Sequence, residues 1–182
     1  MPTYVWFALA AVAIGVYLSW TAGRLDRLHA RVDSTRAALD AQLVRRASIA
    51  LEIATSGLLD PASSLVLAGA AHDARGASEE DREIAESELT RALRIVFGEP
   101  EQVEDLRSRP GGKELIGELR TAVRRVPMAR RFHNEAVRSA RAVRRHRLVR
   151  YLRLAGHAPY PVTFEMDDEE PPTLLPGGGA VS

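Results

Sequence analysis

The chain has 182 residues, a formal net charge of +1 and no cysteine. Its near-neutral charge provides no overall field that would draw the protein to a polyanion. The lack of cysteine excludes disulfides, thiolate metal sites and cysteine nucleophiles. Lys113 is the only lysine, so arginine carries nearly all of the positive charge.

The first predicted element is an apolar helix over residues 4–22, a run that contains no charged side chain. At about 1.5 Å per residue such a helix is about 28 Å long, close to the hydrocarbon thickness of a bilayer. Aromatic side chains flank both ends of the run, where membrane–water interfaces favour them; they are Tyr4, Trp6, Phe7, Tyr17 and Trp20. The run therefore predicts a transmembrane helix.

The flanks of this run predict its orientation. Arg24, Arg27 and Arg31 follow it directly, and positive charge next to a span keeps that side in the cytoplasm. We expect a single-pass protein of the plasma membrane with its N-terminus outside and its C-terminal domain in the cytoplasm. A cleaved signal peptide and a core helix are the alternatives, but no basic region precedes the run and its small-residue triplets lie inside it.

Residues 23–56 predict a long amphipathic helix that continues the apolar run without a break and stops near Gly57. Apolar side chains recur at intervals of three and four residues, as in a coiled coil; the stripe begins with Leu25, Leu28, Val32, Thr35 and Leu39. The same stripe is suited to a partner helix, so it is compatible with a homo-oligomer.

Two further helices are predicted in the middle of the chain. Asp60 is a suitable N-cap, with Pro61 as the first helical residue, for a helix over 62–75. Ser78 is the expected N-cap of a helix that ends at Val96 or Phe97 and turns Ile84 inward.

The last predicted helices follow clear breaks. Residues 98–100 (Gly-Glu-Pro) end the preceding helix and lead into a short helical turn up to Ser108. After the break at 110–112, a final helix runs from about Lys113 to Ala155, with Phe132 on its inward face and a kink near Pro127.

These elements predict an all-α fold in which long helices form an antiparallel three- or four-helix bundle. We place a cytoplasmic helical domain at residues 23–156 and a tail rich in proline, acidic residues and glycine at 157–182. The tail has no helical period, and its composition predicts disorder at least from Asp167 onward.

The strongest candidate surface is the arginine-rich end of the final helix. Its candidate residues for anionic lipid or a protein partner are Arg138, Arg141, Arg144, Arg145, Arg147, Arg150 and Arg153. Lipid headgroups attract such clusters. The alternative is internal pairing with the acidic middle of the chain, between Glu79 and Asp105. Nucleic acid is disfavoured because aromatic residues are nearly absent from this helix.

Other polar groups give weaker signals. Asn134 is a candidate for a buried polar pairing with Gln42. The acidic run at 167–170 is interpreted as a solvated tail rather than a cation site. The histidines lack the spacing of metal ligands, and no rigid nucleophile turn or phosphate-binding glycine loop occurs. The sequence thus predicts no catalytic residues, no metal and no cofactor.

Four runs together resemble the LemA family of membrane-anchored bacterial proteins. LDAQLVRR at 39–46 is near the family's DVQLKRR, and ESELTRAL at 86–93 is near its ENxLSxAL. ARRFHNEAV at 129–137 is near ARRxYNDAV, and the aromatic FE motif near the last helix is matched within 159–165. The sequence departs from the family at 47–51, where HDLIP is replaced by ASIAL, and at His133, where the family has tyrosine.

This resemblance implies one N-terminal span, a cytoplasmic antiparallel helical domain and no established enzymatic activity. We therefore expect a membrane-anchored scaffold or interaction protein without catalysis, with protein partners at the membrane. Two alternatives stay open. One is a regulator or sensor that binds anionic lipid headgroups through the arginine-rich helix, and the other is a subunit of a membrane enzyme complex.

Overall fold

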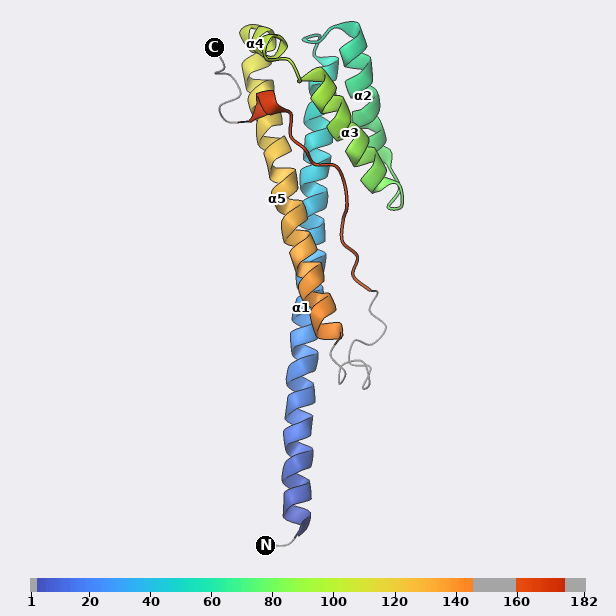
Figure 1. The fold of residues 1–182 in the computed structure, drawn as a ribbon, viewed down its shortest axis with the longest axis vertical. Helices are drawn as coiled ribbons and strands as arrows, with labels where there is room; N and C mark the ends of the chain where they lie inside the picture. Colours follow the sequence, from blue (N-terminus) through green and yellow to red (C-terminus); the bar gives the residue numbers. More distant parts are fainter. Residues whose placement is uncertain (1–2, 146–159, 176–182) are drawn as a thin grey trace. The chain divides into compact units, whose positions relative to one another are not determined.

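The computed structural model of the chain describes residues 3–145 and 160–175, and within them it is all-helical with no strand (Figure 1). The elements are α1 (Thr3–Thr55), α2 (Pro61–Gly76), α3 (Arg82–Val96), α4 (Pro100–Ser108), α5 (Gly112–Arg144) and the 3-10 turn η1 (Pro172–Leu174). The all-α prediction is confirmed for this part of the chain.

Helix α1 joins the apolar run and the amphipathic stretch into one uninterrupted helix, as predicted. Among the described residues, it is the one helix long and apolar enough to cross a membrane. Gly57 follows its end with a φ of 77°, a left-handed conformation that glycine adopts without steric strain. The helix therefore ends where the sequence predicts.

The start of α2 also matches the prediction. The Asp60 carboxylate accepts hydrogen bonds from the backbone N–H groups of Ala62 and Ser63, and Pro61 is the first helical residue. Hydrogen bonds from Ser63 lower the pKa of Asp60, because they stabilise the ionised carboxylate. These bonds satisfy two of the backbone donors that a helix start leaves unpaired.

Helix α3 begins later than predicted, at Arg82, with Asp81 as its N-cap residue. The Ser78 hydroxyl accepts from the Asp81 backbone N–H and donates to the Asp81 carboxylate in the turn before the helix. Ile84 is also misassigned, since its side chain is 66% exposed. The buried face of α3 instead begins with Glu86.

Helix α5 begins after Gly111, whose φ is 77°, and continues through Pro127 without a break. Gly112 is required at its start because a Cβ there would lie 1.8 Å from the carbonyl oxygen of Leu106. Phe132 is 62% exposed, in contrast to the prediction, and His133 is buried instead. The predicted continuation from 146 to 155 lies outside the described residues.

The chain divides into two compact units. Unit 1 comprises Met1–Arg36 with Phe132–Thr163, and unit 2 comprises Ala37–Arg131 with Phe164–Ser182. The main apolar core lies in unit 2 and receives side chains from α1, α2, α3, α4 and α5 and from Leu174. Burial of these apolar side chains is the main force that holds the five helices of this unit together.

Unit 1 has a much smaller core, in which Leu25 and Leu28 of α1 pack with Val143 of α5. Its apolar run is largely exposed. The large exposed side chains of this run are Tyr4, Trp6, Phe7, Leu9, Val12, Ile14, Val16, Tyr17 and Trp20.

Residues 164–175 correct the prediction of a disordered tail from Asp167 onward. Phe164 is buried with Leu39, Leu43 and Val126 in a second core cluster of unit 2, and Leu174 enters the main core. We name residues 164–175 the acidic strap. Residues 157–159 and 176–182 of the predicted tail lie outside the described part.

Candidate functional site

A buried ion pair links α1 to α3 inside unit 2. The side chains of Arg46 and Glu86 are 2% and 1% exposed, and their Nη2 and Oε2 atoms lie 2.7 Å apart. Arg46 also donates to the hydroxyl of Thr90 at 2.9 Å and to the backbone carbonyl of Glu86 at 3.0 Å. Arg82 lies on the other side of the carboxylate, with Nε 3.6 Å from Oε1.

Two opposing effects act on Arg46. Burial lowers the pKa of its guanidinium, and the adjacent Glu86 carboxylate raises it again. The guanidinium Nε has no hydrogen-bond partner within the described part of the chain. The two charges therefore neutralise each other, but one guanidinium donor has no hydrogen-bond acceptor among the described residues. Removal of either side chain would leave the other as an unpaired buried charge.

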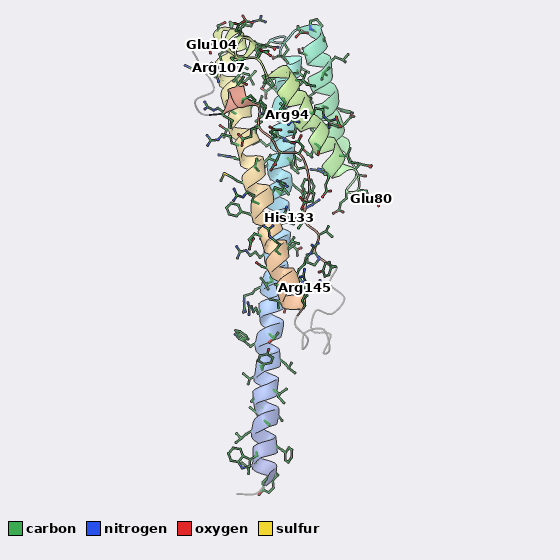
Figure 2. All side chains as sticks on the ribbon, viewed as in Figure 1. Glu80, Arg94, Glu104, Arg107, His133 and Arg145 are labelled. Carbon is green, nitrogen blue, oxygen red and sulfur yellow. The ribbon has the colours of Figure 1, made fainter. Side chains whose placement is uncertain are left out.

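Two arginines hold the acidic strap on unit 2. Arg94 of α3 contacts Asp167, with Nη2 and Oδ2 2.6 Å apart, and also pairs with Glu169. Arg130 of α5 binds Asp168, with Nη2 and Oδ2 2.9 Å apart. Figure 2 labels Arg94 on α3. The acidic run at 167–170, predicted to be a solvated tail, is thus bound by arginine.

Backbone groups of the strap also find partners on α3. The N–H of Glu165 donates to the Glu83 carboxylate at 2.8 Å, and the N–H of Asp167 donates to the Ser87 hydroxyl at 3.1 Å. Further along, the Thr173 hydroxyl donates to the carbonyl of Phe97. These contacts resemble the way a helical surface holds an extended peptide.

One strap carboxylate lies in a less favourable environment. Burial raises the pKa of Glu170, and nearby Asp168 acts in the same direction, while Arg124 opposes them. The Glu170 Oε2 atom has no hydrogen-bond partner among residues 3–145 and 160–175. The strap is therefore held mainly through its earlier carboxylates and its apolar anchors.

The predicted arginine surface lies partly within unit 1. Arg138 pairs with Glu135 on the same helix at 3.1 Å, Arg141 donates to the carbonyl of Pro161 at 2.7 Å, and Arg145 is exposed. Figure 2 labels Arg145 near the end of α5. Arg147, Arg150 and Arg153 lie outside the described residues.

Arginines and acids pair at several places within unit 2. Arg130 of α5 pairs with Glu165 and Asp168 of the strap. Among the acids of the middle of the chain, Glu88 pairs with Arg91 and Glu104 with Arg107, each within its own helix. Pairing of the arginine-rich end of α5 with this acidic segment stays a prediction.

The two residues of the predicted polar pairing have different environments. Asn134 is buried, whereas Gln42 is half-buried and its Oε1 atom has no hydrogen-bond partner in the described chain. Asn134 lies in unit 1 and Gln42 in unit 2. Their pairing stays a prediction.

Within residues 3–145 and 160–175, no group of three or more histidine or carboxylate side chains is placed to hold a metal ion. Comparisons with family models, curated proteins and solved structures find no match for this chain. The geometry of the two units is therefore the basis for a functional proposal.

Proposed function

We propose that the chain is a membrane-anchored interaction protein of the LemA type, without catalysis of its own. The observation that carries the proposal is the continuity of α1. One helix runs from the exposed apolar residues 4–20 into the main core of unit 2, where Ala47, Ile49 and Ile53 are buried. A membrane span joined to a packed helical unit would keep that unit near the membrane surface.

The orientation follows from the flanking charges. Arg24, Arg27 and Arg31 favour a cytoplasmic position for unit 2, with Met1 outside the plasma membrane. We further propose that the helices of unit 2 pack as an antiparallel bundle. A second copy of the chain is one candidate partner, since half-buried Val32 and Thr35 extend the α1 stripe.

Exposed apolar side chains on α2 and α3 are the natural places to look for a protein partner. Ile84 and Ile95 of α3 are each 66% exposed. They are eleven residues apart, so on a helix of 3.6 residues per turn they lie on nearly the same face. Leu65 of α2 is also exposed.

Photo-cross-linking in the native membrane tests this proposal. A photoreactive amino acid at Ile84 or Ile95 is expected to give a discrete adduct with a protein partner, because a docked partner would cover this face. The matched control is Glu104, an exposed residue of α4. We expect no adduct from that position.

The mass of the adduct identifies the partner class. An adduct of twice the chain mass would indicate a homo-oligomer, and an adduct with a membrane enzyme would indicate a subunit role. Recovery of only monomeric, unmodified protein from both isoleucine positions would contradict the proposal.

A further inference from the structure

Unit 1 brings a second set of arginines to the end of the apolar run. Leu25 and Leu28 of α1 pack with Val143, which lies in the last turn of α5. The arginines of α5 therefore lie beside those that follow the span directly. We name this set the basic collar; it consists of Arg24, Arg27, Arg31, Arg138, Arg141, Arg144 and Arg145.

The depth of the collar follows from helix geometry. Leu25 is three residues beyond the end of the apolar run, so it lies about 4–5 Å past the hydrocarbon edge if the helix stands near the bilayer normal. The headgroup region on each side of a bilayer is about 5–7 Å thick. The contact of Val143 with Leu25 thus places Arg144 and Arg145 at headgroup level.

Acidic side chains are sparse in the same stretches. Residues 20–36 and 132–145 contain three acids, namely Asp26, Asp33 and Glu135, and Glu135 pairs with Arg138. The collar therefore retains a clear excess of positive charge. A surface of this kind attracts anionic lipid when it lies within a Debye length of the bilayer.

Two aromatic rings lie beside collar arginines, one on α1 and one in the segment that begins at residue 160. The guanidinium of Arg24 lies 5.9 Å from the Trp20 ring centroid. Arg141 and Arg144 lie 5.1 Å and 5.5 Å from the ring centroid of Tyr160, which is 54% exposed. Stacking against a ring restricts the motion of a guanidinium, and tryptophan and tyrosine favour the headgroup zone.

From this arrangement we propose that the basic collar is a binding site for the headgroups of anionic phospholipids. The inference rests on the proposed transmembrane position of residues 4–22. Guanidinium groups donate in pairs to phosphate oxygens, and the collar presents them from two helices over about 10 Å of helix length. Anionic phospholipids would then be enriched next to the collar relative to the rest of the bilayer.

Tryptophan quenching by brominated lipids tests this proposal on the full-length chain. Trp6 and Trp20 are the two tryptophans, so Trp6→Phe leaves one reporter at the collar and Trp20→Phe leaves one at the far end. Each protein is reconstituted into bilayers of phosphatidylcholine and phosphatidylglycerol in which one lipid is brominated. The apparent preference for phosphatidylglycerol at each tryptophan is then measured.

With Trp20 as reporter, we expect phosphatidylglycerol to be preferred over phosphatidylcholine by at least about fivefold. This ratio corresponds to the attraction of about 1 kcal/mol between one arginine and an anionic surface. Removing three of the seven collar charges, as Arg141→Gln, Arg144→Gln and Arg145→Gln, should lower this preference several-fold, and an unchanged preference would contradict the proposal. Lysine at the same three positions should retain most of it. The matched control replaces Arg120, Arg124 and Arg125 of α5, in unit 2, and should leave the preference unchanged.

The outcomes separate this proposal from the proposed function. Equal quenching by both brominated lipids at Trp20 would overturn the collar while leaving the span intact. Absence of quenching by either lipid would overturn the span itself. If the collar variant lost binding to an RNA oligonucleotide but kept its lipid preference, the collar would be a nucleic-acid site and the proposal would be wrong.

Discussion

Replacement of Glu86 by alanine is expected to destabilise unit 2 by about 3–5 kcal/mol, because it leaves a buried arginine without its counter-charge. Arg46 cannot escape this cost by losing its proton, since a guanidinium stays charged in proteins. Thr90 would still accept one hydrogen bond from Arg46, but a hydroxyl does not neutralise charge. The measurement is urea unfolding of the full chain in detergent, followed by helical circular dichroism.

Two matched variants separate the buried pair from a general effect of removing a carboxylate. Glu88→Ala removes an acid of the same helix whose ion pair with Arg91 is exposed, and it should cost less than about 1 kcal/mol. Joint replacement of Arg46 by methionine and Glu86 by leucine should be neutral or stabilising. A loss below about 1 kcal/mol for Glu86→Ala, the value typical of a surface ion pair, would contradict this account.

Replacement of Phe164 by alanine is expected to release the acidic strap. The ring fills a site between Leu39, Leu43 and Val126, and emptying such a site costs up to about 3–5 kcal/mol. The remaining contacts of Arg94 with the strap are only partly buried, so they are too weak to compensate for this loss. The strap should therefore detach before the helices unfold.

Limited digestion with a glutamate-specific protease measures this release, because the strap contains Glu165, Glu169 and Glu170. We expect Phe164→Ala to be cleaved within the strap at protease concentrations that leave the wild type intact, with the helices still protected. Val162→Ala is the control, since this neighbouring side chain is 66% exposed. Equal cleavage of the two variants would show that Phe164 is not the anchor.

Elements with local signals could be predicted from the sequence. The capping carboxylate of Asp60, the proline after it and the glycines at 57 and 111 each determine the backbone through their own chemistry. The continuous α1 follows from one long helical pattern without a breaker. Such features depend on residues within one or two turns, so a single sequence is enough to find them.

The buried ion pair was missed because it depends on residues 40 positions apart. A signal was present, however. Leu39, Leu43, Arg46, Ala50 and Ile53 continue the spacing of four and three residues, so the periodicity alone places Arg46 on the buried face. An arginine on a buried face requires a partner of opposite charge, and periodicity does not locate that partner.

The strap was missed for a related reason. Its acidic residues and prolines are typical of disorder, and its order depends on Arg94 and Arg130 of two different helices. Phe164 and Leu174 were the available counter-signals, as large apolar residues in a polar segment. Local composition could not show which surface they would fill.

The position of α1 in the membrane is tested most directly by cysteine labelling, which the cysteine-free chain makes unambiguous. Thr3→Cys and Ser34→Cys place single thiols on the two sides of the apolar run. With a membrane-impermeant maleimide, Thr3→Cys should be labelled in intact cells, and Ser34→Cys only after the membrane is permeabilised. Labelling of Ser34→Cys in intact cells, or recovery of the full chain in the soluble fraction, would contradict the account.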